Sequence, residues 1–144
     1  MRAILCTKYG SPDVLELKVI DRPVPAENQV LVKVYAASLN IADLYNLQGG
    51  VGRLSVGFIR PKDERVGRDF AGVVETIGGG VSQFKPGDEV FGACPGTLAE
   101  YAIARENRIT VKPTHCSFEQ AAAVPVAALT ALQGLRYAGQ IKSG

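Results

Sequence analysis

Apolar and polar residues alternate over several short stretches in the first three quarters of the chain, a pattern that is typical of half-buried β-strands. The clearest is 29–38, where Val30, Val32, Val34 and Ala36 are expected on one face and Leu31, Lys33, Tyr35 and Ala37 on the other. Shorter strands are predicted at 1–7, 14–20, 73–77, 97–104 and 108–111. Short strands at such close intervals predict a mainly β fold, a partly open antiparallel β-barrel.

A glycine-rich stretch, 67–92, predicts a hairpin in the middle of this pattern. The triple glycine 78–80 ends an apolar run, and a return strand is expected after the turn residues 86–88. Gly72 falls inside the first strand, where a missing Cβ usually marks a bulge or a close backbone approach. A hairpin without any chemistry is the simplest interpretation of this stretch.

The period changes to that of helices in two places. A short helix is predicted over 40–47, with Asn40 as its N-cap and Asp43 in its first turn. Ser117 and Gln120 form a capping box that starts a helix over 117–124, and Pro125 restarts the chain into a second helix over 126–137. This pair is apolar nearly all round, so we expect cover on more than one side.

Composition narrows the possible functions of the 144 residues. The net charge is +2 with both signs interspersed, which argues against a nucleic-acid surface, and no apolar run is long enough to span a membrane. The three cysteines are far apart and odd in number, which favours neither disulfides nor a zinc knuckle. We therefore expect a protein of the cytoplasm.

One basic cluster, Arg60, Lys62, Arg65 and Arg68, departs from this even distribution. It adjoins the irregular stretch 51–66, which is long enough to form a loop over a cleft and to shape a substrate pocket. A solvated loop face is the favoured interpretation of the cluster, and an anion site is the alternative.

Four motifs occur in an order that resembles the medium-chain dehydrogenase/reductase superfamily, and most closely its zinc-independent quinone oxidoreductase branch. They are Asn40-x-x-Asp43-x-Tyr45, Gly67-x-Asp69-x-x-Gly72-x-Val74 with the later Gly87-Asp88-x-Val90, Gly96-x-x-Ala99-Glu100-Tyr101, and the apolar segment from Glu119 to Ala131. The resemblance covers the whole chain. It implies a GroES-like catalytic domain over 1–116 and linking helices over 117–144 that lead toward a nucleotide-binding domain missing here.

The resemblance also implies candidate site residues. In the family, the residues that match Asn40, Asp43 and Tyr45 line the cleft beside the nicotinamide, and the residue that matches Thr130 lies near it. The candidates for catalysis are therefore Asn40, Tyr45 and Asp43, and the candidates for cofactor binding are Asn40 and Thr130. The alternatives are a helix cap for Asn40, a charge on the helix dipole for Asp43, a packed aromatic with its hydroxyl in water for Tyr45, and a buried hydroxyl bonded to its own helix for Thr130.

No metal is expected. The zinc-dependent branch has Cys in place of Asn40 and His in place of Arg68, and Asn and Arg are poor zinc ligands.

The implied function is hydride transfer from NADPH to a quinone or enone in the intact enzyme, with the present chain inactive and a very weak cofactor binder. Reduction of acyl thioesters is not separable from this, and NADPH rather than NADH is inferred from family habit alone. The alternative is a stand-alone GroES-like scaffold or interaction module. An exposed apolar pair of helices would favour the half-enzyme and self-association through 117–144, whereas a self-sufficient module should bury the pair.

Overall fold

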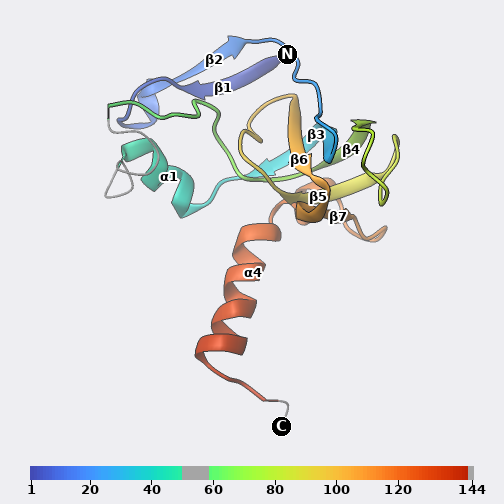
Figure 1. Cartoon of the computed structure of the whole chain (residues 1–144). Helices are drawn as coiled ribbons and strands as arrows, with labels where there is room; N and C mark the ends of the chain where they lie inside the picture. The colour runs from blue at the N-terminus through green and yellow to red at the C-terminus, as the bar shows by residue number, and fades with distance from the viewer. Residues whose placement is uncertain (50–58, 143–144) are drawn as a thin grey trace.

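The structure is a computed structural model that describes residues 1–49 and 59–142. A two-stranded antiparallel sheet pairs β1 (Arg2–Cys6) with β2 (Leu15–Val19), and the 3-10 turn η1 (Pro12–Val14) lies between them. A five-stranded antiparallel sheet has the order β6-β3-β4-β5-β7 (Figure 1). Its strands are β3 (Gln29–Ser38), β4 (Asp69–Ile77), β5 (Glu89–Ala93), β6 (Tyr101–Arg105) and β7 (Ile109–Val111), with the 3-10 turn η2 (Glu106–Arg108) before β7.

The two sheets approach one another through β1. Isolated bridges join Ala3 to Ala99 and Leu5 to Arg65, but the sheets do not close into one ring. The predicted mainly β, partly open antiparallel architecture is therefore confirmed. The strand predicted over 97–104 was placed too early, because the amide of Leu98 donates to the carbonyl of Val66 at 2.9 Å instead of extending the ladder.

The hydrophobic core lies on one face of the five-stranded sheet. Val30, Val32, Phe70 and Val90 are fully buried there, and Phe84 packs beside them from the β4–β5 connection. The predicted face of β3 holds as far as Val34. A register shift between Val34 and Ala36 then breaks the alternation, so Ala36 packs on the opposite side, and its assignment to the core face was wrong.

The glycine hairpin forms as predicted, with β4 and β5 antiparallel and Asp69 opposite Ala93. Gly72 lies opposite Val34, beside that register shift. A Cβ added at Gly72 would collide with the carbonyl oxygen of Lys33, so the predicted close approach of two backbones is confirmed.

Three α-helices lie within residues 1–49 and 59–142. They are α1 (Ile41–Gln48), α3 (Phe118–Ala122) and α4 (Pro125–Gln133), and α4 runs on into a single π-helical turn, η3 (Gly134–Ala138). Gly49 ends α1 with φ at 65°, which is the usual role of a glycine at this position. Gly134 does not interrupt the last helix, so the expected helix over 126–137 is present with a change of winding at its end.

Only one of the two apolar linking helices is covered. Ala121 and Ala122 of α3 are buried against Ala71 of β4, and Phe118 stacks on Tyr35 with ring centroids 4.8 Å apart. By contrast, α4 extends away from the sheets toward the C-terminus (Figure 1), and nearly all of its side chains are exposed. Within the described residues α4 has no such cover, which is the exposed apolar helix that the half-enzyme hypothesis predicted.

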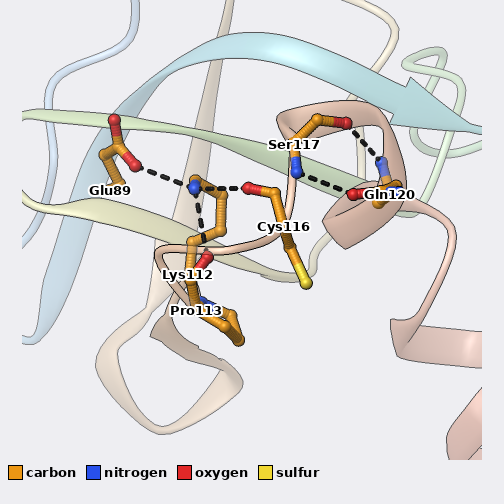
Figure 2. A network of polar contacts seen from close by, with 6 residues as sticks. All are labelled: Glu89, Lys112, Pro113, Cys116, Ser117 and Gln120. Carbon is orange, nitrogen blue, oxygen red and sulfur yellow. Dashed lines mark hydrogen bonds and ion pairs between the residues drawn. The ribbon is translucent and has the colours of Figure 1, made fainter.

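A buried lysine fixes the turn that leads into α3. The ammonium of Lys112, 6% exposed, donates to the carbonyls of Cys116 at 2.7 Å and Pro113 at 3.2 Å, and pairs with Glu89 at 2.9 Å (Figure 2). Directly after this turn, the predicted capping box is present. The backbone N–H of Gln120 donates to the Ser117 hydroxyl, and the backbone N–H of Ser117 donates to the side-chain oxygen of Gln120. The start of α3 is thus held by both local and tertiary hydrogen bonds.

Within residues 1–49 and 59–142, no helix is both long enough and apolar enough to cross a membrane.

Candidate functional site

A buried carboxylate, Asp69 at the start of β4, joins three segments that lie far apart in the sequence. Its side chain is 0% exposed, and Oδ2 accepts hydrogen bonds from Asn40 Nδ2 at 3.2 Å and from the Val126 amide at 3.0 Å. The Ser38 hydroxyl lies 3.5 Å from the same oxygen, at the limit of a hydrogen bond. Oδ1 has no hydrogen-bond partner in the part of the chain that the structure describes. Asp69 therefore connects the end of β3, the start of α1 and the first turn of α4.

Asn40 occupies the predicted N-cap position of α1 and forms a capping box with Asp43. Asp43 Oδ2 accepts the Asn40 backbone N–H at 2.8 Å, the Asn40 side chain faces the Asp43 backbone N–H, and Asn40 Nδ2 donates to Asp69. Asp43 is 8% exposed, so this hydrogen bond is largely shielded from water. Asp43 thus acts as a structural cap, and the Asn40 amide is held in a fixed orientation at the start of α1.

The other two candidates from the sequence lie apart from this junction. Tyr45 is 63% exposed and presents its ring to solvent. The hydroxyl of Thr130 donates to the Val126 carbonyl at 2.7 Å, four residues earlier in α4, and the residue is exposed. Its back-bonded arrangement is the alternative considered for it, although the hydroxyl was expected to be buried.

A cavity of about 310 Å³ lies between α1, β1 and the segment that precedes β4. Asp43 and Leu47 line it from α1, Cys6 from β1, and Gly67 and Arg68 from the segment before β4. Of the four predicted site residues, only Asp43 lines this cavity. Asn40 precedes Asp43 at the start of the same helix, and its partner Asp69 directly follows Arg68, so the carboxylate junction adjoins the cavity.

Charges on the cavity wall include one tight ion pair. Arg65 donates Nε and Nη2 hydrogen bonds to the two oxygens of Asp63, at 2.9 and 2.7 Å. The hydrogen bond from Arg65 lowers the pKa of Asp63 and the one to Asp63 raises the pKa of Arg65, so both groups stay charged. Burial raises the pKa of the Cys94 thiol to about 12, and it also raises the pKa of Cys6. These two thiols are therefore protonated and unreactive near neutral pH.

The role of Asp69 is what sequence reasoning missed. Asp69 stands in the quoted glycine motif, yet nothing in the local pattern shows that its partners are 29 and 57 residues away. A charged residue at the head of an otherwise apolar strand, fully buried, is the signal that could have found it, because a buried carboxylate requires hydrogen-bond donors. Among the described residues, no group of three His, Cys, Asp or Glu side chains is placed to hold a metal ion.

Comparison with known proteins places this geometry in a family. The alcohol dehydrogenase GroES-like domain model matches residues 26–114. A quinone oxidoreductase from Pongo abelii is 35% identical over 147 aligned residues, which cover 100% of this chain and 43% of the relative. The chain thus spans less than half the length of this curated relative.

Solved structures agree. The quinone oxidoreductase from Coxiella burnetii superposes with a TM-score of 0.91 at 37% identity, over 100% of this chain and 46% of that one. The Escherichia coli quinone oxidoreductase complexed with NADPH gives 0.87 at 31% identity, over 99% of this chain and 42% of that one. The resemblance to the medium-chain dehydrogenase/reductase superfamily is confirmed, and the chain belongs to the alcohol dehydrogenase GroES-like domain family.

Proposed function

We propose that this chain is the substrate-cleft domain of a cytoplasmic NADPH-dependent oxidoreductase that reduces a quinone or an enone. Its GroES-like catalytic domain would be 1–116, and 117–144 would link it to a nucleotide-binding domain. The observation that carries the proposal is the Asp69 junction. One buried carboxylate holds both the Asn40 amide at the cleft rim and the first turn of α4, the helix that would lead to the second domain.

The residues present fit the reacting end of the cofactor. Asn40 gives one N–H to Asp69 and its carbonyl oxygen faces the start of α1, which leaves its second N–H without a partner among the described residues. The rest of the cofactor has no counterpart, since the triple glycine 78–80 leads into a second strand and not into a helix that could hold a diphosphate. When bound, a reduced nicotinamide would supply the hydride.

The chain's own contribution is to bind and orient the carbonyl substrate. Negative charge develops on the substrate oxygen during reduction, and a fixed neutral donor at that oxygen lowers the barrier. The Asn40 amide is the best placed, because Asp69 fixes its orientation. The Tyr45 hydroxyl is a second candidate donor, accessible to a ligand because the residue is largely exposed. Asp69 acts through Asn40 and is a positioning residue.

A stand-alone scaffold or interaction module is the alternative. Such a module should bury its own apolar helices, but Leu129, Leu132 and Leu135 remain 54%, 44% and 52% exposed. This exposed row on α4 and η3 supports the first proposal, in which another domain covers the helix. Without that domain, we expect the chain to associate with itself through 117–144, because exposed apolar area of this kind seeks a partner.

Two titrations of the 144-residue chain test the proposal. Calorimetry with NADPH should give a dissociation constant weaker than about 1 mM, because most of the affinity comes from the nucleotide that this domain does not hold. Micromolar binding of NADPH would refute the proposal that the nucleotide is held by another domain. A neutral enone, 4-(3-oxobut-1-enyl)benzamide, should shift the amide resonances of Asn40 and Gly67 in a ¹⁵N–¹H spectrum, and shifts confined to α4 would contradict a substrate cleft.

A further inference from the structure

We propose that the cavity beside α1 is a subsite for an anionic substituent of the substrate, held by Lys62 and Arg68. The inference rests on the proposed function and adds a substrate class to it: a quinone or enone that also carries a carboxylate or a similar anion. It selects the anion-site interpretation of the basic cluster, and Lys62, Arg65 and Arg68 of that cluster all line the cavity.

The first step concerns which charges on the cavity wall are already neutralised. Lining residues include three cations and two carboxylates. Arg65 and Asp63 form a two-pronged ion pair, so neither has charge left for a ligand. Asp43 receives the Asn40 backbone N–H and lies in the first turn of α1, where the helix dipole offsets its negative charge. Both carboxylates therefore have their own partners.

The two remaining cations have no such partner. Neither Lys62 nor Arg68 makes an ion pair with any residue in the described parts of the chain. Their ammonium and guanidinium groups add positive potential at the same hollow, and a concave site concentrates that potential on a ligand more than a flat surface does. An anion in the cavity would be the first counter-charge that these two side chains meet.

The backbone before β4 explains why Arg68 and Asp69 serve different purposes. Gly67 has φ at +91°, a conformation that favours glycine. After it, Arg68 lines the cavity while the next residue, Asp69, is buried at the Asn40 junction. Adjacent side chains of an extended segment point in opposite directions. Arg68 therefore faces the cavity and Asp69 faces the Asn40 junction, so the anion subsite and the carboxylate that holds Asn40 are adjacent along the chain.

The remaining wall of the cavity is apolar, with Leu47, Pro61, Val66 and Pro95 among its lining residues. At about 310 Å³, the volume is at the small end of the range for ligand pockets. This combination suits an aromatic or short aliphatic acid whose ring lies on the apolar wall, and it is poorly suited to a large lipid.

The test compares two compounds that differ in one charge, 4-(3-oxobut-1-enyl)benzoate and its neutral carboxamide. Each is titrated into the 144-residue chain at fixed ionic strength, and binding is followed in ¹⁵N–¹H spectra. The carboxylate should bind about tenfold more tightly, as expected for a charge-assisted contact in a partly enclosed site. Arg68→Gln and Lys62→Gln should each remove most of that preference. Arg60→Gln, the same charge change in a neighbouring residue that does not line the cavity, should leave it unchanged.

The outcomes separate the subsite from the proposed function. Equal affinity for the two compounds, or a preference that survives both cavity variants, overturns the subsite and leaves the function standing. Failure of either compound to shift the resonances of Gly67 and Arg68 overturns both. Inorganic phosphate is the last arm: if it displaces the carboxylate at equal concentration, the cavity is a general anion site and the substrate assignment is wrong.

Discussion

Replacing Asp69 tests whether the junction depends on the shape of the carboxylate or on its charge. Two substitutions of Asp69 are expected to differ in their effect on stability. In Asp69→Ala, the Asn40 amide and the Val126 N–H both lose their acceptor in a site from which water is excluded. In Asp69→Asn, the side-chain carbonyl can still occupy the position of Oδ2, and the new NH₂ takes the place of Oδ1, which has no partner to lose.

The magnitudes follow from this difference. A hydrogen bond to a charged group contributes about 1.5–3 kcal/mol and an unsatisfied buried donor costs about 1–3 kcal/mol, so Asp69→Ala should destabilise the fold by about 3–5 kcal/mol. Asp69→Asn retains the acceptor and removes the desolvation cost of a buried charge, but its NH₂ has no acceptor at the place of Oδ1, so we expect a loss of about 1–2 kcal/mol. The 3.5 Å contact from Ser38 is too long to change either figure much.

Urea unfolding followed by circular dichroism measures both effects, and equal m-values would show that the unfolded states are comparable. Hydrogen exchange at Val126 supplies the local readout, since its amide should be protected in the natural chain and in Asp69→Asn but not in Asp69→Ala. If Asn is as harmful as Ala, charge and not shape holds the junction. If Ala costs less than about 1 kcal/mol, the junction does not hold α4 at all.

Three further predictions concern the frame around the site. Lys112→Met should lower the free energy of unfolding in urea by about 2–3 kcal/mol, because it leaves two carbonyls before α3 without a donor. Exposed Lys85→Met should change it by less than about 0.5 kcal/mol, and equal effects of the two substitutions would contradict the role of Lys112. Gly67→Ala should lower the free energy of unfolding by about 2 kcal/mol or more, since φ is +91° and the new Cβ would lie 2.5 Å from Thr97 Oγ1. Gly79→Ala should be nearly neutral, because a Cβ added there has nothing within 4 Å. The reverse order would refute this interpretation of the turn. At pH 8, a disulfide reagent should label half-exposed Cys116 quickly and Cys94 very slowly, because the pKa of Cys94, raised to about 12, leaves about one thiolate in ten thousand. Fast labelling of two or more thiols in the folded chain would contradict the burial of Cys6 and Cys94. The same raised pKa stabilises the folded state fully below 9.0, the ordinary value, and that contribution is lost as pH rises toward about 12.

Local patterns in the sequence were sufficient for elements whose causes are local. The alternation in 29–34, the glycine hairpin around Gly72 and the capping box at Ser117 each predicted a structure that is present. The capping box joins residues three apart in the sequence, and the hairpin turns at Gly87, whose φ of 94° few other residues adopt.

The site could be predicted only in part, because its causes are tertiary. The Asn40 side chain, besides its place in the capping box of α1, donates to a carboxylate 29 residues further on, and the cavity is lined from four separate segments. The hydrophobic pattern showed that α4 needs a partner, and it predicted an exposed helix for a half-enzyme, but it did not show which surface supplies the cover. The expectation for the stretch 51–66 concerns residues of which 51–58 lie outside those that the structure describes.

The most direct test of the proposed function joins this chain to the part of the Escherichia coli quinone oxidoreductase that it does not match, so that both halves of an enzyme are present. NADPH oxidation at 340 nm is then measured with a soluble quinone. We expect quinone-dependent oxidation that falls about 10²-fold or more in Asn40→Ala, the usual effect of losing a donor at a developing oxyanion, and remains unchanged in Leu39→Ala. A folded chimera that binds NADPH but shows no turnover, or turnover indifferent to Asn40, would contradict the assignment of this domain as the substrate cleft.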